Sequence, residues 1–76
     1  SRDAVYDVVV ANILAPVLDQ LAEALEALVA AGGLLLISGL LRSQADHLIA
    51  RYEALGLVVV RRSEEGDWVL LEMRRR

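Results

Sequence analysis

Uninterrupted apolar runs alternate with helical repeats in the first half of the chain. Residues 6–11 and 34–38 are rich in valine, leucine and isoleucine without polar alternation, which is typical of strands covered on both faces of a parallel sheet. Between them, apolar residues recur at helical spacing from 17 to 29, after a proline suited to a first helical turn. The pattern predicts a strand–helix–strand unit whose helix ends at Gly32-Gly33.

A second helix and two further strands are predicted after residue 38. Gly39 permits a turn, and the apolar stripe of residues 43–52 predicts a helix that Ser43 and Asp46 would cap. Residues 57–62 and 68–73 are predicted strands, and the short loop between them favours an antiparallel hairpin. The expected fold class is α/β, with the order β-α-β-α-β-β in a single unit, residues 1–76.

This order of elements leaves one face of the sheet without cover. Strand–helix–strand units are right-handed, so two crossovers in one direction place both helices on the same face. Apolar side chains of 8–10 and 34–37 nevertheless point to both faces. Leaving several of them in water costs on the order of several kcal/mol at about 25 cal/mol per Å², against a total stability of about 5–15 kcal/mol. We therefore expect cover from outside these residues, either the rest of a larger domain or a second copy.

Composition narrows the class of protein. The chain has 76 residues, of which 57% are hydrophobic, which is more than so short a chain needs for a closed core. Its net charge of −3 argues against direct nucleic-acid binding. The absence of cysteine excludes disulfides and thiolate chemistry, and it fits a cytoplasmic location. Uninterrupted apolar runs such as residues 34–37 are far too short to span a membrane, so no membrane partner is expected.

Two segments stand where ligands bind in open parallel sheets, outside the carboxyl ends of the strands. They are residues 12–15 (NILA) and 38–41 (SGLL). Each also has a purely structural interpretation: Asn12 would help to cap the coming helix, and Ser38-Gly39 would form a simple turn.

Other polar residues offer weaker signals. His47 is the only histidine, so we expect a solvated helix face and no metal site. Glu64 and Glu65 are expected as solvated turn residues, and Trp68 as a core or sheet-edge residue. None of the five glycines forms a G-x-G-x-x-G turn, so the chain lacks a complete cofactor cradle and a flavodoxin-like nucleotide-binding function is disfavoured.

Residues 6–14 (YDVVVANIL) resemble the fourth-strand motif of class I S-adenosylmethionine methyltransferases, in the form found in the branch that methylates a ribosomal protein. Supporting matches follow in order at residues 32–33, 38–41, 44–46 and 66–69. The resemblance implies half of a Rossmann-like methyltransferase fold, the C-terminal half. It would form a four-stranded mixed sheet in the order 1-2-4-3, with the last strand antiparallel and two helices on one face. An absent N-terminal half would carry the glycine loop and cover the other face.

The resemblance also implies roles for site residues. Asn12 would be catalytic, accepting hydrogen bonds from the substrate amine, and would border S-adenosylmethionine together with Ile13. Leu14, Ser38 and Gly39 would contact a ribosomal protein substrate. The cofactor would serve the full-length enzyme and would bind poorly to these 76 residues alone. The alternative is a non-catalytic α/β module that self-associates through its uncovered sheet face.

Overall fold

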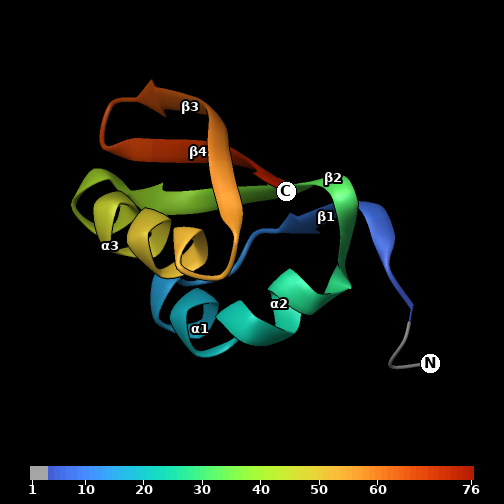
Figure 1. Ribbon diagram of the computed structural model, residues 1–76. Coiled ribbons are helices and arrows are strands. Elements are labelled where there is room, and N and C mark those ends of the chain that lie inside the picture. Colours follow the sequence, from blue (N-terminus) through green and yellow to red (C-terminus); the bar gives the residue numbers. More distant parts are fainter. Residues whose placement is uncertain (1–3) are drawn as a thin grey trace.

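A computed structural model describes residues 4–76 of the chain. It contains four strands and three helices (Figure 1). In chain order these are β1 (Tyr6–Ala11), α1 (Ala15–Gln20), α2 (Ala22–Leu28), β2 (Val29–Leu41), α3 (Arg42–Glu53), β3 (Leu57–Glu65) and β4 (Trp68–Arg75).

The strands form one mixed sheet in the order β1-β2-β4-β3. β1 runs parallel to β2, with Ala11 opposite Ile37, and β4 lies antiparallel between β2 and β3. The predicted strand order and the antiparallel last strand are therefore confirmed. The tight turn at Gly66-Asp67 returns the chain directly along β3, and the other edge of β4 pairs with β2.

All three helices cover the same face of the sheet, as Figure 1 shows. Strand residues that point toward the helices are buried, and Tyr52 of α3 packs there with its hydroxyl donating a 2.7 Å hydrogen bond to the carbonyl oxygen of Leu18 in α1. The largest fully buried side chains are those of Leu18, Val29, Leu35, Ile37, Leu40, Leu48, Tyr52, Leu57, Val69, Leu71 and Met73. The predicted one-sided arrangement is thus confirmed.

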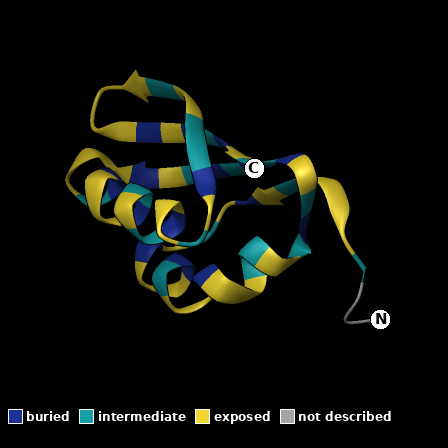
Figure 2. Cartoon of the chain, viewed as in Figure 1, coloured by how far each residue is buried: buried dark blue, intermediate teal, exposed yellow. Residues whose placement is uncertain are grey.

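The opposite face of the sheet is open. Along β4 buried and exposed residues alternate, which appears as bands in Figure 2. Val10 of β1 is 68% exposed, and Val8 beside it and Leu70 of β4 are also exposed. The expectation that this chain covers one face only is therefore confirmed for the described residues, 4–76.

The first predicted helix differs from the structure. It is divided at Leu21 into α1 and α2, so three helices, and not two, cover the face. Leu21 has the non-helical angles φ −92° and ψ 8°; its N–H donates to Val17 O at the end of α1, and its carbonyl oxygen accepts from Leu25 N at the start of α2. The helix also ends earlier than Gly32-Gly33, because Val29 is buried in β2 and pairs with Tyr6 of β1.

Three of the four strands, β2, β3 and β4, are longer than the pattern predicted. β2 continues through Gly39, where a turn was expected, because the strand accommodates that residue as an irregularity between Ile37 and Leu40. The Ser43–Asp46 cap expected for the second helix is wrong as well. α3 begins at Arg42, and the Gln44 side chain accepts a 2.9 Å hydrogen bond from the backbone N–H of Leu41.

Candidate functional site

The two segments singled out in the sequence meet at the carboxyl ends of β1 and β2. Asn12 directly follows β1, and Gly39 lies in β2 two residues beyond Ile37, the partner of Ala11. Gly39 adopts φ +80°, and a Cβ built on it would lie 2.8 Å from the Asn12 side-chain oxygen Oδ1. The amide of Asn12 therefore lies directly over the Gly39 backbone, where only a glycine leaves room for it.

Asn12 is not used to cap the following helix. The N-cap of α1 is Leu14, and no side-chain hydrogen bond caps this helix. Asn12 is exposed, and among residues 4–76 no side-chain hydrogen bond to it is found. The capping interpretation of Asn12 is therefore wrong, and its amide oxygen and nitrogen are available to a ligand.

Ile13 and Leu14 have different surroundings. The Ile13 side chain is half-buried and packs against the core. The Leu14 side chain is 73% exposed, and its carbonyl oxygen accepts hydrogen bonds of 3.0 Å from the backbone N–H groups of Val17 and Leu18. The apolar side chain of Leu14 can thus contact a ligand, whereas its carbonyl oxygen is already used as an acceptor in the first turn of α1.

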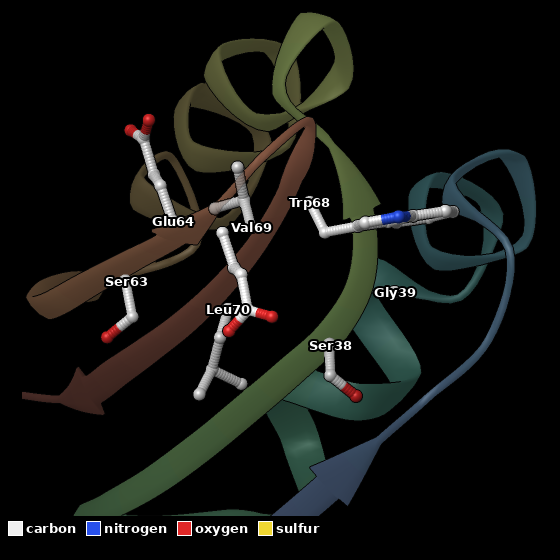
Figure 3. Close-up of a pocket in the computed structure, with 8 residues that line it drawn as sticks. Ser38, Gly39, Ser63, Glu64, Trp68, Val69 and Leu70 are labelled. Atoms are coloured by element: carbon white, nitrogen blue, oxygen red, sulfur yellow. The ribbon is translucent and has the colours of Figure 1, made fainter.

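Ser38 and Gly39 line an open hollow of about 390 Å³ on the uncovered side of the sheet. Its other wall comes from the β3–β4 hairpin, and Figure 3 shows the Trp68 indole extending across β2 beside Gly39. The lining residues are Ser38, Gly39, Ser63, Glu64, Glu65, Trp68, Val69 and Leu70. The hollow thus combines hydroxyls, carboxylates and one large aromatic ring.

Trp68 and the hairpin are the part of this site that the sequence analysis missed. Trp68 is 57% exposed on the open face, so its interpretation as core is wrong. The alternation along β4 could have placed it: Val69, Leu71 and Met73 are buried, and Trp68 shares the other side of the strand with Glu72. A charged residue on the same strand face as an apolar one signals that the face is solvent-accessible.

Charged side chains at the hairpin form a network on the rim of this hollow. Glu64 accepts from Arg42 at 2.9 Å and from Arg62 at 2.8 Å, and Arg62 also donates to Asp46 at 3.0 Å. The hydrogen bond with Asp46 raises the pKa of Arg62 above its ordinary value, with Glu64 adding to the effect. One carboxylate of the hollow is thus already paired with two guanidinium groups.

His47 belongs to a separate cluster on the helical side. It is exposed, and its Nε2 lies 3.2 Å from Asp19 Oδ1 across α1 and α3, which agrees with the predicted solvated helix face. Within residues 4–76, no group of three or more histidine, aspartate or glutamate side chains is placed to hold a metal ion. In the same part of the chain, no helix is long and apolar enough to cross a membrane.

Solved structures with this arrangement are methyltransferases. A ribosomal protein L11 methylase from Lactobacillus delbrueckii subsp. bulgaricus superposes with a TM-score of 0.88 at 25% identity, over 97% of this chain and 39% of that one. The N-methyltransferase NodS from Bradyrhizobium japonicum WM9 superposes with a TM-score of 0.67 at 14% identity, over 95% and 52%. The strand order and the helices on one face thus define part of a Rossmann-like methyltransferase fold.

Sequence similarity identifies the family within that class. The sequence model of the family described as Ribosomal protein L11 methyltransferase (PrmA) matches residues 1–76. A relative of that name from Stenotrophomonas maltophilia (strain R551-3) is 50% identical over 66 residues, or 87% of this chain and 21% of the relative. One from Cupriavidus necator is 51% identical over 69 residues, or 91% and 23%. The chain belongs to the PrmA family and spans about a fifth of the length of these relatives.

Proposed function

We propose that the chain is the C-terminal part of an S-adenosylmethionine-dependent methyltransferase that modifies amines of a ribosomal protein. Residues 1–76 would form one unit of its catalytic domain. The similarity to ribosomal protein L11 methyltransferases supports the ribosomal protein as substrate. The cytoplasmic location expected of such an enzyme stays a prediction.

The observation that carries this proposal is the position of the Asn12 amide over Gly39, at the carboxyl ends of two parallel strands. There its oxygen would accept a hydrogen bond from the attacking amine and direct the nitrogen lone pair. Such an amine must be neutral, and a site that excludes water favours the neutral form. The contribution of Asn12 is then alignment, which accounts for a large part of the rate in reactions of two bound groups.

S-adenosylmethionine would supply the methyl group, and the residues present fit one wall of its site. Asn12 would border it with an exposed amide, and Ile13 would support that loop by packing its side chain against the core. The chain has no G-x-G-x-x-G turn to hold the rest of the cofactor. We therefore expect these 76 residues alone neither to bind it usefully nor to catalyse.

The substrate side of the site would consist of Leu14, Ser38 and Gly39. Ser38 and Gly39 line the hollow, and the exposed Leu14 side chain lies at the start of α1. The indole of Trp68 adds an aromatic wall suited to the aliphatic stem of an amine side chain. This wall is our assignment for the aromatic platform that the Asn-Ile-Leu motif itself does not provide.

The uncovered sheet face would be covered by the rest of the enzyme. This chain spans about a fifth of its relatives, so most of their polypeptide lies outside it. The alternative, a second copy of this chain on the same face, predicts that the intact enzyme dimerises through that face.

Asn12→Ala in the intact enzyme tests the proposed alignment. We expect kcat to fall by roughly 100-fold, because the amine loses its orientation, with little change in the cofactor Kd. Turnover assays and calorimetric titration with S-adenosylmethionine measure the two quantities. Gln20→Ala, which removes another exposed amide at the end of α1, should change neither. Equal losses in rate and cofactor affinity would contradict the aligning role.

A further inference from the structure

The turn between β3 and β4 is fastened to the start of α3 by one residue, Arg42. Its backbone N–H donates a 2.8 Å hydrogen bond to the carbonyl oxygen of Asp67. Its guanidinium donates at 2.7 Å to the carbonyl oxygen of Gly66 and pairs with Glu64 at 2.9 Å. Arg42 therefore holds both residues of the turn and the strand that leads into it.

A second arginine reinforces this attachment. Arg62 of β3 pairs with Glu64 at 2.8 Å and with Asp46 of α3 at 3.0 Å. Glu64 thus lies between two guanidinium groups, and the hairpin is joined to α3 at two points. A guanidinium suits this role because its fixed fork of donors can hold a carbonyl and a carboxylate at once.

The attachment of the hairpin to α3 fixes the position of Trp68. It directly follows the turn and pairs with Leu41, the residue before Arg42. Its indole lies across β2 beside Gly39 and is more than half exposed, so little protein surrounds it (Figure 3). The direction of the ring consequently depends on where the turn holds its backbone.

The network is too exposed to matter much for global stability. The side chains of Arg42 and Asp46 are 55% and 89% exposed. Exposed ion pairs of this kind contribute little to the stability of a fold. Their effect must be local, on a hairpin tip that the core residues do not reach.

We propose that Arg42 is a positioning residue, which holds the Trp68 indole across β2 beside Gly39 as the wall that receives the aliphatic stem of the acceptor amine. The reading of that wall as an acceptor site rests on the proposed function. The role of Arg42 in fixing the turn that precedes Trp68 does not rest on the proposed function, and it can be measured separately.

Fluorescence of the 76-residue chain, at dilutions where sedimentation shows it to be monomeric, tests the attachment, because Trp68 is its only tryptophan. Arg42→Ala should lower the steady-state anisotropy of Trp68 and increase its quenching by acrylamide roughly twofold, since the backbone beneath the ring is released. Arg51→Ala is the matched control: it lies on the same helix and also pairs with two carboxylates, Asp19 and Glu23, but far from the hairpin. Far-UV circular dichroism verifies that each variant is folded.

Kinetics in the intact enzyme test the consequence. Arg42→Ala should raise KM for the protein substrate roughly fivefold, with a smaller effect on kcat, because a binding wall is lost and the aligning amide is kept. Arg42→Lys should restore part of the anisotropy and of KM, since an ammonium pairs with Glu64 without the fork. Arg51→Ala should leave both unchanged.

The outcomes distinguish the attachment, by which Arg42 fixes Trp68, from the role of Trp68 in binding the acceptor amine. Equal Trp68 anisotropy in Arg42→Ala and Arg51→Ala would overturn the attachment, whatever the enzyme does. Released Trp68 with unchanged KM in Arg42→Ala would overturn the positioning role. If Trp68→Ala also leaves methyl transfer at the wild-type rate, the proposed acceptor wall falls while the attachment stands.

Discussion

At the scale of single residues, Gly39 combines a backbone requirement with a side-chain contact. Its φ of +80° favours glycine, and the Asn12 amide occupies the space that a Cβ would take. Gly39→Ala should therefore lower the free energy of unfolding by about 1–2 kcal/mol through the left-handed conformation. It should also lower kcat of the intact enzyme by roughly tenfold or more, because the aligning amide is displaced. Urea unfolding and turnover assays measure the two effects.

Gly32→Ala provides a matched control for that substitution. Gly32 has φ +75°, nearly the same as Gly39, but nothing lies within 4 Å of a Cβ built there. Gly32→Ala should lower the free energy of unfolding by a similar amount, but it should leave the alignment by Asn12 unchanged. A loss of kcat as large in Gly32→Ala as in Gly39→Ala would contradict a specific contact between Gly39 and Asn12.

Single residues also mark how far the sequence alone could predict the site. Asn12 and Ser38-Gly39 were recognisable because the carboxyl ends of neighbouring parallel strands must lie together. Trp68 was not, because its place depends on the register of β4 against β2, with Trp68 opposite Leu41, which the strand order alone does not specify. The partners of Arg42 were equally hidden, since they depend on a two-residue turn where a longer loop was expected.

At the scale of the elements, Tyr52 joins two helices that are distant in sequence. Its hydroxyl donates to the Leu18 carbonyl oxygen at 2.7 Å, and the ring is fully buried. Tyr52→Phe should lower the free energy of unfolding by about 1–2 kcal/mol, because a buried carbonyl loses its donor. Tyr6→Phe, at an exposed position, should cost much less in the same denaturation experiment.

The same tyrosine predicts a loss of stability in alkali. Burial raises the pKa of Tyr52 to about 12, with Arg51 opposing the shift and Asp19 adding to it. In the unfolded chain it ionises near its ordinary value of 10.0, so the folded state binds the proton more tightly. The stabilisation that comes from keeping the Tyr52 hydroxyl protonated is complete below pH 10. As the pH approaches 12, the free energy of unfolding should decline by on the order of 2 kcal/mol. Denaturation across this range should show that decline in the wild-type chain and not in Tyr52→Phe.

The elements themselves were largely predictable, and the exceptions have physical causes. The hairpin and the common helical face followed from apolar runs and right-handed crossovers, whereas the strand order was implied by the resemblance to methyltransferases. The end of the first helix was placed too late because Val29 fits a helical stripe as well as it fits a strand. Pairing with Tyr6 decides in favour of the strand, and local spacing contains no information about that partner.

At the scale of the whole molecule, the open sheet face governs how the isolated chain behaves. Val8, Val10, Trp68 and Leu70 expose apolar surface together, and burying it yields about 25 cal/mol per Å². Without its cover, the 76-residue chain should therefore self-associate in a concentration-dependent manner. Val10→Asp should reduce this association, whereas Val17→Asp, the same change at an exposed valine on the helical side, should not. Sedimentation equilibrium measures the association, and a tight wild-type monomer at high concentration would contradict it.

The intact enzyme then distinguishes the two kinds of cover for that face. If the rest of the polypeptide lies over Val10, Val10→Asp buries a charge within one subunit and should lower the free energy of unfolding by several kcal/mol, on the order of the cost of an unpaired buried carboxylate. If a second copy covers it, the same substitution should instead convert a dimer to a monomer, which makes the stability of the wild-type enzyme, and not that of the variant, depend on protein concentration. Denaturation and sedimentation of the Val10→Asp and Val17→Asp enzymes give opposite patterns for the two cases. We expect the first pattern, because this chain spans only about a fifth of its relatives and its sheet needs the cover that their remaining polypeptide can supply.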